Sequence, residues 1–159
     1  MFYLNSVMDW SMYDLHQTMK ANPEWWLKND SGEYIELVGQ HVFDLSVEGC
    51  RGAWLAVLHN AKASGAIDGA FLDRGNYVGS VIKGLSPARQ AAWDAGHDII
   101  EAGAQAIFNG SVVILNNANS PKVSARQCNA RNAHPHRSSQ CLPSDKQMHS
   151  KPVITLPSF

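Results

Sequence analysis

The chain has 159 residues, enough for one domain of ordinary size. A hydrophobic content of 45%, a charged content of 17% and a formal net charge of −1 are normal for a globular protein and favour neither nucleic acid nor a membrane surface as a partner. No apolar run reaches the roughly 20 residues that span a bilayer. The N-terminal sequence MFYLNSVMDW also lacks the features of a signal peptide. We therefore expect no nucleic-acid or membrane partner. The cellular location is not predicted, and whether a longer parent protein is secreted stays open.

The charge divides the chain into two parts. Residues 1–118 hold 7 Lys and Arg against 13 Asp and Glu, whereas residues 119–159 hold 6 against 1. The second part is rich in Ser, Asn, Pro, Lys, Arg and His and has little periodicity, which is typical of disorder. We expect a structured domain over 1–118 and a low-order basic tail over 119–159. A misread exon boundary or a frameshift would also produce such a tail, and sequencing the transcript tests this.

The N-terminal third predicts one strand, one helix and a long excursion. The apolar run Phe2–Val7 predicts a strand, and Met12–Ala21 predicts a short helix that ends at Asn22, because the residue before a proline avoids the helical region. The excursion covers residues 24–40. Its alternating residues 34–37 predict one arm of a small hairpin.

The middle of the chain predicts a helix followed directly by a strand. An apolar stripe over residues 47–61 predicts the helix, with Ser46 as its N-cap and Gly65 as its C-terminal stop. The strand Ala66–Asp73 has a short apolar centre without alternation, which predicts burial on both faces.

A second helix and a third strand complete the pattern. Pro87 in a first turn predicts the helix, and Ser111–Leu115 predicts the strand. This helix carries a face of small residues: Ala91, Ala92, Ala95, Ile99, Ala102 and Ala106. Strands joined by such crossovers should be parallel, with right-handed connections. We predict an α/β fold with about three parallel strands, as part of a (β/α)8 TIM barrel or of a larger doubly wound sheet.

Asp73 is the main candidate for a functional residue. It ends the predicted central strand, and the carboxyl ends of parallel strands carry the chemistry of β/α folds. Glycosidases place a pair of carboxylates there. The alternative is that Asp73 caps a turn or pairs with Arg74. Asp68 lies at the opposite end of the strand, where a turn role is expected.

Three amide side chains are expected at the same edge as Asp73. Asn5 ends the first strand, and Asn116 and Asn117 follow the third. They could donate hydrogen bonds to sugar hydroxyls or simply close the strands. Asp44 could cap the following helix or line the site, and Tyr3 is expected in the core.

Five tryptophans divide by position. Trp10, Trp25 and Trp26 fall in the loops after the first strand, where an indole could stack on a sugar ring or anchor the loop. Trp54 and Trp93 fall on helix stripes and are expected in the core.

The histidines and cysteines match no ligand spacing of a metal site. The chain also contains no phosphate-binding loop and no nucleophile elbow. We expect no metal and no cofactor.

Four short motifs occur in order along residues 1–118: FYLNSV, then PEWWL with a later Ser-Gly, then VFDLS followed by Arg51 and Trp54, and finally IDGAFLD. Together they resemble the glycoside-hydrolase-like TIM-barrel family. That family shares a strand ending in Tyr-x-Asn, a Pro-x-x-Trp loop, an Asp-x-Ser helix entry and an Asp-Gly-x-Phe-x-Asp strand.

The resemblance implies an O-glycosyl hydrolase, in truncated form, acting on an oligo- or polysaccharide. Asp73 would be the nucleophile, on about the fourth strand of the barrel. The substrate-binding candidates are Asn5, Trp10, Trp25, Trp26, Asp44, Arg74, Asn116 and Asn117. Because no carboxylate ends the third strand, a non-catalytic carbohydrate-binding remnant is the alternative. Another α/β enzyme, with Asp73 as a metal ligand, is a third.

Overall fold

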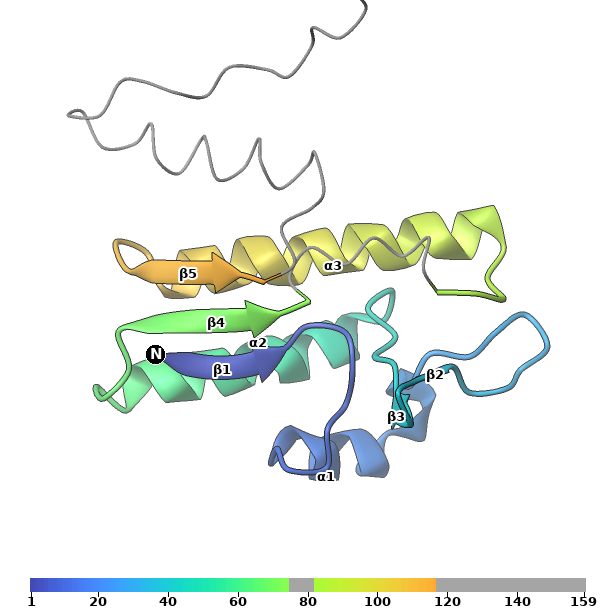
Figure 1. The fold of residues 1–159 in the computed structure, drawn as a ribbon, viewed down its shortest axis with the longest axis horizontal. Coiled ribbons are helices and arrows are strands. Elements are labelled where there is room, and N and C mark those ends of the chain that lie inside the picture. The colour runs from blue at the N-terminus through green and yellow to red at the C-terminus, as the bar shows by residue number, and fades with distance from the viewer. Residues whose placement is uncertain (75–81, 117–159) are drawn as a thin grey trace, which may run out of the picture. The chain divides into compact units, whose positions relative to one another are not determined.

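A computed structural model describes residues 1–74 and 82–116 of the chain (Figure 1). Three strands form one parallel sheet in the order β1-β4-β5, with bounds Phe2–Asn5, Gly69–Asp73 and Val112–Leu115. This confirms the predicted α/β class and the three parallel strands. The tail expected over 119–159, like Asn117, lies outside the described residues.

Two long helices connect the strands. Helix α2 spans Glu48–Ala63 and precedes β4, and helix α3 spans Pro87–Ile107 and precedes β5. The two helices pack against each other, and a Cβ atom on Gly103 of α3 would lie 2.7 Å from a methyl carbon of Leu55 on α2. Both helices therefore lie on the same side of the sheet (Figure 1). None of the helices in the described part of the chain is long and apolar enough to cross a bilayer.

The segment between β1 and α2, which includes the excursion over residues 24–40, contains only short elements. Helix α1 (Leu15–Ala21) begins three residues later than predicted, and a 3-10 turn, η1 (Pro23–Trp25), follows it. The predicted hairpin is present as β2 (Glu36–Leu37) and β3 (Gln40–His41), which pair antiparallel.

The predicted N-cap of α2 is wrong, whereas the predicted stop is confirmed. Val47 occupies the cap position, and the hydroxyl of Ser46 donates instead to Oδ1 of Asp44. The Arg51 guanidinium then bonds the carbonyl oxygens of Leu45 and Ser46, at 2.8 and 2.9 Å, and holds the chain at the helix entry. Gly65 follows the helix with φ 72°, the left-handed conformation that glycine adopts readily.

The small-residue face of α3 does not pack against the core. The small-residue stripe is exposed, and the opposite side is buried: Trp93, Gly96, His97, Ile100, Glu101 and Ala104. Trp93 is one of the largest fully buried side chains, and its indole N–H donates to the carbonyl oxygen of Phe43 at 2.8 Å. A Cβ atom on Gly96 would overlap the carbonyl oxygen of Leu45, so the buried side of α3 lies directly against the backbone at Leu45.

The two faces of the sheet differ among the described residues. The face toward the helices is buried, with Leu4, Leu72 and Leu115 aligned across the strands. On the other face, Tyr3 is 44% exposed and Ile114 is 40% exposed. Within β4 itself, Gly69 is buried and Phe71 and Asp73 are half-buried on this second face, so the prediction that β4 is covered on both faces holds fully on the helix side and only in part on the other. The helix-side core does contain Trp54 and Trp93 as predicted, and both are fully buried.

Candidate functional site

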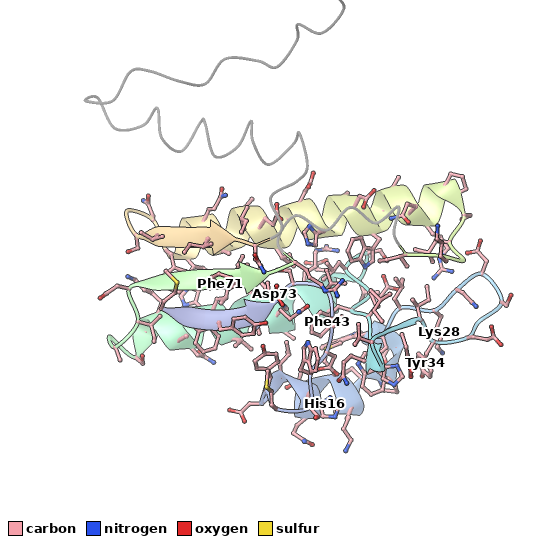
Figure 2. All side chains as sticks on the ribbon, in the orientation of Figure 1. His16, Lys28, Tyr34, Phe43, Phe71 and Asp73 are labelled. Atoms are coloured by element: carbon pink, nitrogen blue, oxygen red, sulfur yellow. The ribbon has the colours of Figure 1, made fainter. Side chains whose placement is uncertain are left out.

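Asp73 lies at the carboxyl end of β4 (Figure 2). Its carboxylate accepts four hydrogen bonds. Its Oδ2 accepts from the Tyr3 hydroxyl at 2.8 Å and from Asn5 Nδ2 at 3.2 Å, both on β1. Its Oδ1 accepts from Asn116 Nδ2 at 2.8 Å, directly after β5, and from the backbone N–H of Arg74 at 3.0 Å. The donors to this carboxylate therefore come from β1 and from the residues directly after β4 and β5.

The parallel register explains why these side chains meet. Asn5 lies opposite Asp73 across β1 and β4. The N–H of Asn116 donates to the carbonyl oxygen of Leu72 at 3.0 Å, which continues the ladder past β5 and brings its side chain to Asp73. The structure thus brings together Asn5, Asp73 and Asn116, as their shared strand edge predicts.

Asp73 is an ionised carboxylate at neutral pH. Burial of the carboxyl group favours its neutral form, but hydrogen bonds from Asn116, Tyr3 and the Arg74 N–H, together with the Arg74 charge, outweigh that effect. They hold the pKa of Asp73 below its ordinary value of 3.8, because each of them stabilises the anion.

Two tyrosines next to Asp73 were not predicted as site residues. Tyr3 is not in the core, and its ring stacks on Phe71 with 5.7 Å between centroids and 17° between planes. Burial and the Asp73 carboxylate raise the pKa of Tyr3. Burial, with smaller contributions from Tyr3 and Asp73, raises the pKa of Tyr13 to about 12. The sequence did carry a signal for Tyr3, which is two residues from Asn5 and so shares its face of the strand.

Asn5 closes the turn after β1, which is the structural alternative considered for it, and it also contacts Asp73. Its Oδ1 accepts the backbone N–H groups of Val7 and Met8, at 2.9 and 2.7 Å, and so closes the turn after β1. Its Nδ2 remains directed at Asp73. The indole of Trp54 bonds the Asn5 carbonyl oxygen at 2.9 Å, which fixes this residue from the helix side.

The backbone bends sharply immediately after the carboxylate. Arg74 has φ 57°, a left-handed conformation that costs a non-glycine residue about 1–2 kcal/mol. The N–H of this same residue donates to Oδ1 of Asp73 at 3.0 Å. Backbone strain of this kind is concentrated at functional sites in proteins.

The predicted tryptophans and Asp44 form no hydrogen bond with Asp73. Trp10 is half-buried against the core, and Trp25 lies over α2, where a Cβ atom on Gly49 would be 2.6 Å from its ring. Asp44 bonds both the N–H and the hydroxyl of Ser46. The contacts of Trp10 and Trp25 match the loop-anchoring alternative, whereas Asp44 bonds the residue before the cap position and does not cap α2.

Trp26 belongs to a separate aromatic cluster made of Trp26, Tyr34, His41 and His16. Its ring centroid lies 4.5 Å from that of His41 and 5.9 Å from that of Tyr34. Its indole N–H and His16 both bond Oδ2 of the buried Asp9, at 2.9 and 2.8 Å. Lys28 Nζ lies over the Tyr34 ring of this cluster, and Figure 2 shows both side chains beside the β2–β3 hairpin, away from Asp73.

Within residues 1–74 and 82–116, no group of three or more His, Cys, Asp or Glu side chains could hold a metal ion. No model of a known protein family matches the chain, and no curated protein matches it. The arrangement around Asp73 can accept hydrogen bonds from a ligand or attack an electron-poor carbon through a carboxylate oxygen.

Proposed function

We propose that the chain is part of a glycoside-hydrolase-like TIM barrel that hydrolyses O-glycosidic bonds of an oligo- or polysaccharide. Asp73 is the nucleophile or base. The observation that carries the proposal is the ionised Asp73 carboxylate at the shared edge of three parallel strands, flanked by the amides of Asn5 and Asn116.

The topology supports this proposal. The strand order follows the chain order and both long crossovers lie over one face, as in consecutive units of a barrel. One half of a doubly wound sheet has the same local arrangement. In both architectures ligands bind at the carboxyl ends of the strands, where Asp73 lies.

The ionisation state supports the role of nucleophile or base for Asp73 within this chemistry. A glycosidase uses one carboxyl group of raised pKa as the acid and one ionised carboxylate as nucleophile or base. The low pKa of Asp73 fits the second role only. The other strand ends in the described part of the chain carry the amides of Asn5 and Asn116, so we assign no acid.

The experiment is hydrolysis of a panel of aryl glycosides by the purified chain. We expect Asp73→Asn to lower the rate by at least about 10³-fold, as loss of a nucleophile does. Asp68→Asn, the same change at the other end of the same strand, should leave the rate unchanged. Activity that survives Asp73→Asn rejects the role of Asp73, and activity that a chelator removes favours the metal-dependent alternative.

A non-catalytic carbohydrate-binding role is the second candidate. The strand ends in the described part of the chain carry no second carboxylate beside Asp73, which favours binding without catalysis. Tyr34 is 42% exposed and offers an aromatic surface for a sugar ring. Sugar binding that persists in Asp73→Asn and is lost in Tyr34→Ala would support this role over hydrolysis.

A further inference from the structure

The four hydrogen bonds on Asp73 fill its acceptor sites. A carboxylate offers about four lone-pair positions, two on each oxygen. Tyr3 and Asn5 occupy Oδ2, and Asn116 and Arg74 occupy Oδ1. A donor group of a ligand therefore reaches this carboxylate only by replacing one of these four.

Three of the four donors are held by the backbone. The Arg74 donor is the peptide N–H adjacent to Asp73 itself. Asn116 is tied to the ladder by its N–H bond to the carbonyl oxygen of Leu72. Asn5 is fully buried, and its Oδ1 is held by two backbone N–H groups. Displacing any of these donors would disturb a strand end or a turn.

Tyr3 is the exception. Its side chain is on the open face of the sheet, and the residue is 44% exposed. Its hydroxyl is at the end of a side chain that rests on the Phe71 ring, and the hydroxyl has its own torsional freedom. It can leave Oδ2 without breaking a backbone hydrogen bond.

We propose that the Tyr3 hydroxyl is a displaceable placeholder on Asp73, and that a ligand hydroxyl replaces it at Oδ2. Oδ2, rather than Oδ1, is then the oxygen that meets the ligand. The assignment of a polyhydroxylated ligand rests on the proposed function. Tyr3 acts here through Asp73 and is a positioning residue.

The test combines a pH titration with a binding titration of the full chain. The Asp73 carboxyl group is followed by NMR with ¹³C-labelled aspartate, and its signal is assigned by its loss in Asp73→Asn. The probes are the methyl glycosides of glucose, galactose, mannose and xylose.

In Tyr3→Phe the ring and its stacking on Phe71 remain, but the hydroxyl is gone. The pKa of Asp73 should rise, because a bond to its anion is lost. The best probe should bind about threefold to tenfold more tightly, since one net hydrogen bond no longer has to be displaced. Tyr13→Phe is the matched control. It removes a neighbouring hydroxyl that makes no hydrogen bond with Asp73, and it should change neither quantity by a comparable amount.

The proposal is overturned if Tyr3→Phe leaves the pKa of Asp73 unchanged, if the probes bind it equally or more weakly than wild type, or if no probe shifts the Asp73 signal in either protein. The proposed function fails separately. Tighter probe binding in Tyr3→Phe without aryl-glycoside hydrolysis rejects the hydrolase and keeps the role of Tyr3. Asp73-dependent hydrolysis with unchanged affinity in Tyr3→Phe rejects only the placeholder.

Discussion

The contact between Tyr3 and Asp73 shifts two ionisations in opposite directions. The hydroxyl stabilises the Asp73 anion and so helps to lower the pKa of the carboxyl group, while burial and then the nearby anion raise the pKa of the Tyr3 phenol. Each shift links protonation to folding, because the unfolded chain lacks the contact. The two ionisations therefore affect stability at opposite ends of the pH scale.

At the acid end, we expect Asp73→Asn to remove a pH-dependent part of the stability. The folded-state pKa lies below the ordinary value of 3.8, so the contribution is present above that value and is lost as the pH falls through 3.8 toward the folded-state pKa. Urea unfolding measured from about pH 6 to about pH 3 checks this. The wild-type and variant free energies of unfolding should converge as the pH falls, and a constant difference would contradict the linkage.

At the alkaline end, the prediction concerns a second tyrosine, Tyr13, whose pKa is raised mainly by burial. Its pKa is raised from 10.0 to about 12, so its contribution to stability is complete below pH 10 and is lost as the pH rises to about 12. Tyr13→Phe should therefore flatten the alkaline part of the curve of unfolding free energy against pH. The chain has 4 tyrosines, so the difference in phenolate absorbance between wild type and Tyr13→Phe follows the titration of this phenol. A Tyr13 that titrates at its ordinary value would show the prediction to be wrong.

At the scale of single residues, strand-end position was a good guide and side-chain chemistry a poor one. Asn5, Asp73 and Asn116 could be placed together because parallel strands end at one edge. Tyr3 was assigned to the core because an aromatic residue in a short strand resembles a core residue. Asp9 gave no signal, since its contacts with His16 and Trp26 depend on how the excursion folds back.

The helices show what a hydrophobic pattern can specify. In α2 the predicted stripe includes the three buried residues Cys50, Trp54 and Leu58. In α3 the alanines form a regular stripe but bury little area each, so Trp93 and Ile100 determine the packing face instead. The sequence alone does not show which helix glycine lies against another part of the backbone: Gly96 does and Gly52 does not.

Two helix glycines give a matched prediction. A Cβ atom on Gly96 of α3 would overlap the carbonyl oxygen of Leu45, whereas one on Gly52 of α2 would have no neighbour within 4 Å. We expect Gly96→Ala to destabilise the fold by about 1–3 kcal/mol, as overpacking does. Gly52→Ala should stabilise it by about 0.5–1 kcal/mol through the higher helix propensity of alanine.

Chemical denaturation of the two glycine variants and the wild type under one set of conditions measures both effects. Equal shifts of the same sign would mean that α3 does not lie against the backbone at Leu45.

At the scale of the molecule, the sheet has one covered face and one exposed face among the described residues. We expect Ile114→Lys, on the exposed face, to change the free energy of unfolding by about 0.5 kcal/mol or less, as surface substitutions do. Leu115→Lys is the control, because Leu115 is 4% exposed and its neighbours lie under the helices. Thermal and urea unfolding distinguish the two variants. Strong destabilisation by Ile114→Lys would show that the second face is covered, as in a closed barrel.

The pattern of the chain predicted the α/β class, the parallel strands and their connections, because crossovers of this length allow little else. It could not distinguish consecutive units of a barrel from half of a doubly wound sheet, since both repeat the same local pattern. Coverage of the sheet is likewise a property of the assembled molecule. The alternation within Phe2–Asn5 showed two kinds of face but did not determine what would lie over each.

The convergence on Asp73 joins segments that are distant along the chain: Asn5 is 68 residues away and Asn116 is 43 residues away. No local fragment can reproduce its surroundings. Separation of β1 removes two donors, and separation of β5 removes one. The ¹³C signal of this one carboxyl group therefore reports cooperativity: a single sharp change on unfolding means that the strands part together, and two stepwise changes mean that one edge opens first.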